Sequence, residues 1–223
     1  MSTVRPAAGG GRFVEVSPAR VSGWFDRFGA RHGGVLSTDI HGDTVTVLAA
    51  DHATARVTTP FPPLGLPEGR HPGLVITGLV AHLCLPRRIG LLLVRLGGHS
   101  IGIAEEGRVL VSATDRKQVH GRNKAGGWSQ HRFARRREGQ AAVALRSAAD
   151  DAARVLAPRV GELVGVVLGG DRRALEVLRG DPRLADVFAI ALPKVLDVPE
   201  PRRAVLDDAA DRALAVEILV TEP

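Results

Sequence analysis

Apolar positions in several short stretches of the chain alternate with polar ones, as they do in strands that bury one face. Turns rich in glycine separate many of these stretches, so neighbouring strands are expected to pair as antiparallel hairpins. The apolar run near residue 163 lacks the alternation, which is typical of a strand buried on both faces. We therefore predict strands over residues 12–16, 35–40, 44–49, 53–58, 88–96, 100–105, 108–113, 163–168, 187–192 and 213–220.

Apolar residues recur at three- and four-residue intervals in other segments, and this spacing predicts helices. Ser17 and Asp171 precede two of these segments as natural N-caps. Residues 60–72 are rich in proline and predict a loop, while residues 75–83 fit either a helix or a strand. The expected helices cover residues 18–32, 132–156, 172–178 and 201–212, and the longest should bury Ala141, Leu145, Ala148, Ala152 and Val155.

A meander of strands followed by alternating strands and helices predicts an α/β fold in which helices cover a mixed β-sheet. The chain has 223 residues, of which 44% are hydrophobic, so a sizeable core is expected. We predict one domain over residues 12–223, preceded by a flexible tail over residues 1–11. One cysteine forms no internal disulfide and fits the cytoplasm, and no apolar run reaches the length of about 20 residues that spans a membrane.

The positive charge of the chain is concentrated in one internal segment. Residues 116–137 contain eight Lys or Arg and no acid, a net charge of +8 in a chain whose total is +6. The remaining residues are therefore slightly acidic, at −2. Such a cluster repels itself unless a polyanion or solvent relieves it, so it favours contact with nucleic acid over a purely solvated loop or a membrane-surface patch.

The basic segment predicts a mobile loop over residues 116–131 that leads into the longest helix. Gly126 and Gly127 permit close backbone approach to a ligand. Trp128 either stacks on a base or packs the loop onto the domain. Arginine forks and a helix start both suit phosphate. The residues expected to contact nucleic acid, which the family resemblance described below identifies as tRNA or rRNA, are Lys117, Arg122, Lys124, Arg132, Arg135, Arg136 and Arg137.

Gln130 is the candidate catalytic residue, within a loop formed by Gly126, Gly127, Trp128 and Ser129. Its amide group can orient a water molecule, and its backbone N–H can donate to a developing oxyanion. On spacing alone, the Gly-Gly-x-x-Gln pattern of residues 126–130 is weak evidence for a catalytic site.

Residues 124–137 read KAGGWSQHRFARRR. This segment resembles the catalytic loop of release-factor-like peptidyl-tRNA hydrolases, and more closely that of the actinobacterial Vms-like release factor (VLRF) family. The resemblance implies an RNase H-like fold similar to the middle domain of the eukaryotic class-I release factor. It also implies that Gln130 matches the family's essential glutamine. Release factors proper carry Gly-Gly-Gln, whereas Trp128 and Ser129 precede Gln130 here.

The implied function is codon-independent hydrolysis of peptidyl-tRNA on stalled ribosomal complexes, with the large ribosomal subunit and peptidyl-tRNA as partners. The main alternative is a non-catalytic ribosome- or RNA-binding protein that uses the same basic loop. The histidines show no metal-ligand spacing and one cysteine builds no zinc site, so neither a metal nor a cofactor is expected. Asp39 and Asp43 leave a weaker alternative, a metal-dependent nuclease. Gly169 and Gly170 lack a phosphate-loop pattern and predict a strand-to-helix turn.

Overall fold

The last strand, β12 (Val216–Thr221), returns to a sheet that is otherwise built from the N-terminal part of the chain. The computed structural model divides accordingly into two compact units, Met1–Pro86 with Leu214–Pro223, and Arg87–Ala213. We had expected a single domain over residues 12–223, and the arrangement differs because local patterns do not reveal which sheet a distant strand joins. The structure describes residues 4–8, 10–95, 97–116 and 129–223, with the side chains of residues 116 and 129–138 left out.

The first unit contains an antiparallel sheet of seven strands in the order β1-β2-β12-β5-β4-β3-β6. Inward-facing valines and alanines of this sheet pack against Phe25, Phe28 and Leu79 from two helices. The elements of this unit before β12 are β1 (Val4–Pro6), β2 (Arg12–Val16), η1 (Pro18–Arg20), α1 (Val21–Arg31), β3 (Val35–His41), β4 (Thr44–Ala49), β5 (Thr54–Thr58), β6 (Gly69–Pro72) and α2 (Thr77–Leu83).

The alternating pattern predicted this unit's inner strands well, and the differences lie at its edges. Part of the expected tail forms β1, which pairs antiparallel with β2. The expected proline-rich loop ends in β6, an edge strand paired only with β3 among the described strands. Ser17 occupies the N-cap position of η1, but its side chain makes no capping hydrogen bond. An edge strand forms where a neighbouring strand has unpaired backbone N–H and C=O groups, and the pattern of apolar residues carries no information about these groups.

The second unit contains a mixed sheet in the order β11-β10-β7-β8-β9. The pairs β7–β8 and β8–β9 are antiparallel, as the predicted meander requires, whereas β10 runs parallel to both β7 and β11. The elements of this unit are β7 (Arg88–Arg95), β8 (Gly98–Glu105), β9 (Arg108–Arg116), α3 (Ser129–Val155), η2 (Ala157–Glu162), β10 (Val166–Gly170), α4 (Arg172–Arg179), η3 (Pro182–Leu184), α5 (Ala185–Ala189), β11 (Ala191–Leu196) and α6 (Arg203–Leu214).

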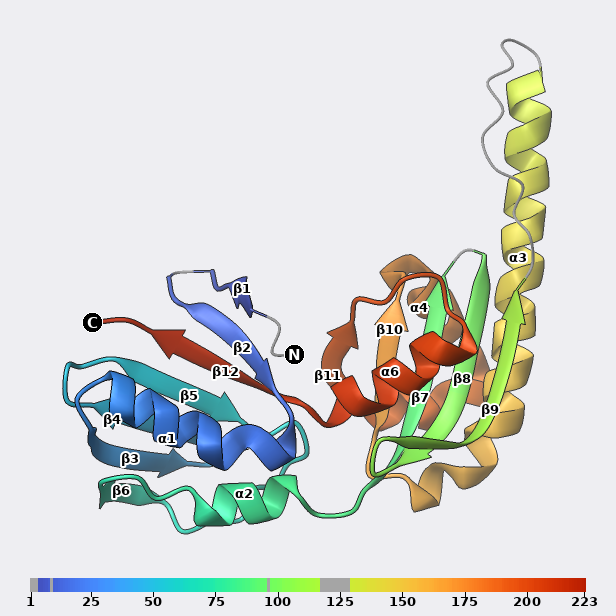
Figure 1. Ribbon diagram of the computed structural model, residues 1–223. Helices are drawn as coiled ribbons and strands as arrows, with labels where there is room; N and C mark the ends of the chain where they lie inside the picture. The colour runs from blue at the N-terminus through green and yellow to red at the C-terminus, as the bar shows by residue number, and fades with distance from the viewer. Residues whose placement is uncertain (1–3, 9, 96, 117–128) are drawn as a thin grey trace. The chain divides into compact units, whose positions relative to one another are not determined.

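Helices cover both faces of the mixed sheet, which confirms the expected α/β class (Figure 1). On one face, alanines of α3 and leucines of α4 share a core with Leu92 and Val94 of β7. On the other face, Leu206 of α6 is fully buried and lies so close to Gly102 of β8 that an added Cβ there would come within 2.9 Å of it. The sheet is therefore the central layer of this unit.

Two predicted elements of the second unit are displaced. The strand expected at residues 163–168 begins at Val166, after η2. The strand expected at residues 187–192 was partly wrong, because Ala185–Ala189 is the short helix α5 and the strand runs over Ala191–Leu196. Val187 and Phe188 are buried in the helix, so a short apolar run was equally compatible with either type of element.

Candidate active site

The predicted catalytic segment connects the edge strand β9 to helix α3. Ser129 and Gln130 are the first two residues of α3, so the helix begins three residues earlier than expected. Arg132, Arg135, Arg136 and Arg137 follow in its first turns. Lys117, Arg122, Lys124, Gly126, Gly127 and Trp128 lie outside the described residues. The structure therefore brings the glutamine and four arginines of the prediction onto the N-terminal part of one helix.

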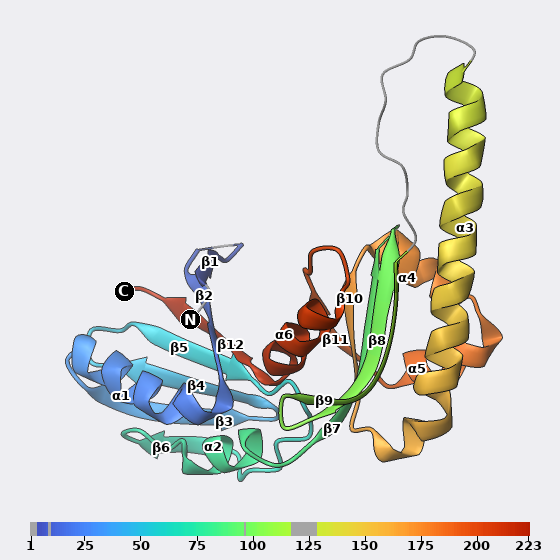
Figure 2. The ribbon, with the colours of Figure 1, turned by 45° about the vertical axis from the view of Figure 1, so that its right-hand side comes forward.

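Helix α3 is long enough to carry its first turns away from the core. It has 27 residues, which at 1.5 Å per residue span roughly 40 Å. Among its described side chains, Ala144, Ala148, Ala149, Ala152 and Val155 are buried, whereas Val143 is half exposed. Two views show the N-terminal half continuing beyond the ends of β8 and β9 (Figures 1 and 2). The predicted apolar stripe is largely confirmed, although Ala141 and Leu145 are only partly buried.

The C-terminal half of α3 is held to the sheet by a buried histidine. His99 of β8 is 1% exposed, and its Nε2 lies 2.8 Å from Asp151 Oδ2 of α3. The other carboxylate oxygen of Asp151 accepts a 2.6 Å hydrogen bond from Arg154 on the next turn. A buried ring N–H without an acceptor would be costly, so this pair ties a specific point of the helix to β8.

A second contact joins α3 to β9, the strand that leads into the predicted catalytic loop. Ser147 Oγ donates to Asp115 Oδ2 at 3.1 Å, one residue before the strand ends. The adjacent residue Thr114 lies 2.6 Å from Ser100 across the β8–β9 pair, oxygen to oxygen. The C-terminal end of strand β9, which precedes the predicted loop, is therefore hydrogen-bonded directly to the C-terminal half of helix α3, which follows it.

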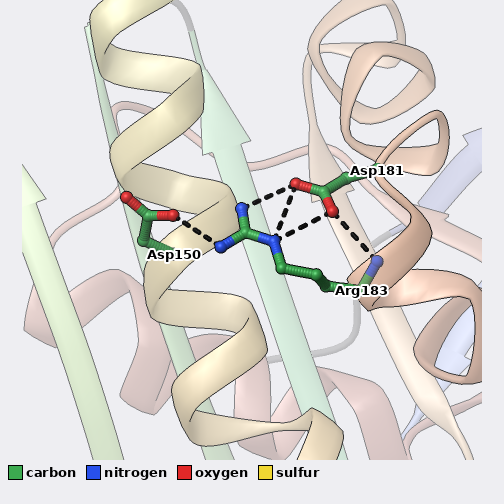
Figure 3. A network of polar contacts seen from close by, with 3 residues as sticks. All are labelled: Asp150, Asp181 and Arg183. Carbon is green, nitrogen blue, oxygen red and sulfur yellow. Dashed lines mark hydrogen bonds and ion pairs between the residues drawn. The ribbon is translucent and has the colours of Figure 1, made fainter.

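A third contact links α3 to η3 through one arginine (Figure 3). Arg183 Nη1 donates to Asp150 Oδ1 at 2.8 Å, while its Nε and Nη2 donate to the two carboxylate oxygens of Asp181. The hydrogen bonds that the Arg183 side chain and backbone donate lower the pKa of Asp181, and donation to both aspartates raises the pKa of Arg183. The planar fork of arginine fixes this geometry in a way that lysine would not.

These three contacts arise from a single turn of α3. Ser147, Asp150 and Asp151 are spaced by three and four residues, so their side chains project from neighbouring positions of the helix surface. They reach β9, η3 and β8 respectively. A helix whose one face is hydrogen-bonded to three separate elements is restrained in both rotation about its axis and sliding along it. We infer that this turn, which we call the anchor turn, sets where the first residues of α3 point.

The charge state of Asp151 makes the anchor turn sensitive to acid. Partial burial raises the pKa of Asp151 and is the largest single effect, but the hydrogen bonds from His99 and Arg154 together outweigh it, so the pKa lies below its usual value. A carboxyl whose pKa is lower in the folded state stabilises the fold above its unfolded-state pKa. This contribution is lost as the pH falls below about 4 and through the folded-state pKa.

Replacing Asp151 with alanine should destabilise the protein by about 2 kcal/mol at pH 7, because the buried His99 loses its partner. The variant should also lose less stability than the wild type between about pH 5 and pH 3, since it lacks the titrating group. Urea unfolding at a series of pH values measures both effects. Asp186→Asn, at an exposed position of α5, should change the free energy of unfolding by less than about 0.5 kcal/mol. A wild-type-like pH profile for Asp151→Ala would show that this carboxylate has no such role.

Sequence reasoning missed the anchor turn. His99 and Asp151 are 52 residues apart, and no local spacing signals their pairing. The only available signal was that Ser147, Asp150 and Asp151 stand next to the apolar stripe predicted for this helix. His99 was counted among histidines without metal-ligand spacing, and its structural partner is a carboxylate.

The two aspartates behind the nuclease alternative have structural partners in the first unit. Asp43 Oδ1 accepts a 2.7 Å hydrogen bond from the backbone N–H of Leu64, and Asp39 lies 3.5 Å from Arg70. Among the described residues, no group of three or more His, Cys, Asp or Glu is arranged to hold a metal ion. Asp39 and Asp43 are thus used in loop and strand contacts.

The Gly169-Gly170-Asp171 segment is the strand-to-helix turn that was expected. Gly170 has a φ of +98°, and the N–H of Asp171 donates to the Val94 carbonyl at 2.8 Å. The Asp171 carboxylate caps α4 by accepting from the backbone N–H groups of Arg173 and Ala174. None of the helices in the described parts of the chain is both long and apolar enough to cross a membrane.

Two solved structures are similar to this chain at low sequence identity. An archaeal translation termination factor, aRF1, matches with a TM-score of 0.41 and 14% identity, over 74% of this chain and 48% of that one. Dom34 of S. cerevisiae, a translation termination-like factor involved in RNA quality control pathways and interacting with Hbs1, matches with a TM-score of 0.33 and 8% identity, over 92% of this chain and 65% of that one. The chain spans about half the length of the first of these proteins.

No curated protein matches the chain. A family model does, over residues 87–219, and its description is Actinobacteria/chloroflexi VLRF1 release factor. This range contains the whole unit Arg87–Ala213, with β9, the predicted catalytic segment and α3, and it covers more than half of the chain. The chain belongs to the Actinobacteria/chloroflexi VLRF1 release factor family.

Proposed function

We propose that this protein is a peptidyl-tRNA hydrolase that releases nascent peptide on stalled ribosomal complexes, independently of a codon. The observation that carries the proposal is the release-factor family match across residues 87–219, which includes Gly126, Gly127 and Gln130. The proposed site of action is the cytoplasm, and the proposed partners are the large ribosomal subunit and its peptidyl-tRNA.

The charge distribution supports binding of the tRNA end by the start of α3. Arg132, Arg135, Arg136 and Arg137 lie in the first turns of the helix, where cations oppose the helix dipole and cost about 0.3–1 kcal/mol each at low salt. A phosphate at this position reverses the sign of that interaction. Arginine forks bind phosphate through two parallel hydrogen bonds, so this group of residues suits the 3′ strand of a tRNA.

The proposed reaction is hydrolysis of the ester between the peptide and the 3′-terminal ribose. A water oxygen attacks the ester carbonyl carbon, the bond from that carbon to the ribose oxygen breaks, and the ribose oxygen takes up a proton. Gln130 would orient the water through its amide group and stabilise the oxyanion through its backbone N–H. An ester is already activated, so positioning contributes much of the required acceleration.

The anchor turn gives this proposal a structural basis, because it restrains the far end of the helix that begins with Ser129 and Gln130. The bonds from Ser147, Asp150 and Asp151 reach β9, η3 and β8. A catalytic group must be held close to its productive geometry, and a rigid helix achieves this better than a free loop.

The experiment that tests the proposal is peptide release from purified stalled ribosomal complexes that carry a labelled nascent chain. Wild-type protein should release the peptide, Gln130→Ala should not, and Gln140→Ala should resemble the wild type. Gln140 is a matched control because it is a second glutamine of the same helix. Failure of the wild-type protein to release peptide would contradict the proposal.

The alternative, a ribosome- or RNA-binding protein without catalysis, rests on the same +8 segment. Replacing Arg135, Arg136 and Arg137 with glutamine should weaken ribosome binding and flatten its dependence on salt, by about 0.7 in the log–log slope for each lost contact to single-stranded phosphate. Both readings predict this result, and cosedimentation at several salt concentrations measures it. If binding is unchanged, the basic segment does not contact RNA.

The two readings separate in a second assay with the same proteins. If Gln130→Ala supports ribosome rescue as well as wild type does, the non-catalytic alternative is correct. If Gln130→Ala binds stalled complexes normally but releases no peptide, hydrolysis is the function.

A further inference from the structure

A small pocket in the first unit is lined by residues of α1 and of the strands β1, β2 and β12. Its floor comes from three adjacent strands, because Val4 of β1 pairs in register with Val14 of β2, and Arg12 of β2 pairs with Val220 of β12. Helix α1 forms the wall. The lining residues are Val4, Arg12, Val14, Trp24, Arg27, Phe28, Arg31 and Val220.

The wall of the pocket is aromatic. The ring of Trp24 is stacked parallel to that of Phe28, with centroids 5.6 Å apart and an interplanar angle of 9°. Phe28 itself is almost fully buried, whereas Trp24 is only partly covered. A planar ring system that enters the pocket therefore meets an aromatic pair already held in a stacked arrangement, which is the surface that nucleobases prefer.

The rim of the pocket carries cations and no acid. Arg27 and Arg31 are exposed on α1, and within the part of the chain that the structure describes neither forms an ion pair. Arg12, on the opposite side, forms an ion pair with Glu222, which is not among the lining residues. Two uncompensated guanidinium groups beside an apolar floor favour an anionic ligand.

The size of the pocket narrows the class of ligand. Its volume is about 190 Å³, below the roughly 300–1,000 Å³ that is typical of sites for whole small molecules. It suits one ring system of a longer molecule better than a complete cofactor. A base supplies the ring, and the adjoining phosphates supply the negative charge for arginines spaced four residues apart on one helix face.

We propose that this pocket binds an unpaired nucleotide of RNA. The base contacts Trp24 and the valines of the floor, and Arg27 and Arg31 contact the flanking phosphates. This contact is separate from the basic segment of residues 116–137 and does not depend on hydrolysis by Gln130. It gives the protein a second point of attachment to RNA, in the unit that lies mostly outside the family match.

Fluorescence of Trp24 tests the proposal without ribosomes. The chain has two tryptophans, so Trp128→Phe leaves Trp24 as the only one. Combining it with Arg135→Gln, Arg136→Gln and Arg137→Gln weakens binding to the basic segment. Adding single-stranded oligoadenylate RNA should quench the fluorescence of Trp24 in a saturable way, because a stacked base changes the indole environment.

Matched charge removals identify the residues responsible. Arg27→Gln with Arg31→Gln should weaken the quenching titration about tenfold, as expected when two phosphate contacts are lost. Arg20→Gln with Arg56→Gln removes the same charge from exposed positions outside the pocket and should change the affinity less than twofold. All four positions are exposed, and circular dichroism confirms that each double variant is folded.

Several results would overturn the proposal. Trp24 fluorescence that does not respond to RNA would show that no base enters the pocket. Equal weakening by the two double variants would show a general effect of charge. Equal quenching by polyphosphate, which has no bases, or by an oligoglutamate peptide, would show a different anionic ligand. None of these results bears on peptide release, so the proposal and the hydrolase function fail independently.

Discussion

Replacing Gln130 with alanine is expected to slow peptide release by about 100- to 1,000-fold, because the attacking water loses the amide group that orients it and one pre-organised polar group in an active site typically contributes this much. The alanine keeps the backbone N–H, so the loss reports what the side-chain amide does to the attacking water. Alanine is also a strong helix former, which leaves the start of α3 intact. The measurement is single-turnover release from stalled complexes with protein in excess, so that binding does not limit the rate.

Three further variants make this result interpretable. Gln140→Ala, at the partly buried position ten residues further along α3, should release peptide at nearly the wild-type rate. Gln130→Glu replaces the amide group with a carboxylate and should also be slow, because it no longer offers an amide donor. Gln130→Asn retains the amide on a shorter side chain and should recover part of the rate. A rate for Gln130→Ala within threefold of wild type would remove Gln130 from the mechanism.

Replacing Gly170 with alanine is expected to destabilise the second unit by about 3 kcal/mol or more, through strain in the backbone and overlap with a neighbour. Gly170 has a φ of +98°, where a side chain is rarely accommodated. An added Cβ would lie far inside van der Waals contact with the Val94 carbonyl oxygen, a backbone atom of β7. That oxygen already accepts the N–H of Asp171, so it cannot move away without breaking the turn into α4.

Gly161→Ala provides the matched comparison. Gly161 lies in η2 of the same unit, has an ordinary φ, and its added Cβ would meet no atom within 4 Å. Its effect should be within about 0.5 kcal/mol of zero. Urea unfolding followed by circular dichroism measures both variants. If Gly170→Ala and Gly161→Ala have equal free energies of unfolding, then β10 does not approach β7 this closely at the turn.

Local sequence patterns predicted the fold of the second unit where glycine-containing turns separate stretches of alternating apolar and polar residues. Residues 88–113 were expected as three consecutive strands, and β7, β8 and β9 pair antiparallel in that order. Asp171 was expected to cap α4 and does so. Such features depend on residues close together in sequence, where turn chemistry and side-chain capping act.

Only part of the candidate site could be predicted from the sequence. A cluster of eight cations without an acid, followed by an arginine-rich helix start, can be recognised by counting. The anchor turn cannot, because Asp151 and Ser147 look like ordinary polar residues on an exposed helix face. Only after β8 and β9 are placed beside α3 do His99 and Asp115 become their partners.

Local sequence patterns were enough to predict most strands and helices, the concentration of charge in residues 116–137 and the family resemblance around Gln130. These are local properties, set by periodicity, turn residues and composition. Long-range contacts, by contrast, place β12 in the first sheet, divide the chain into two units and tie one face of α3 to β9, η3 and β8 through Ser147, Asp150 and Asp151. Each of these depends on pairing between segments separated by tens to hundreds of residues, and such pairings are selected by the burial and hydrogen bonding of the whole fold, not by any one segment.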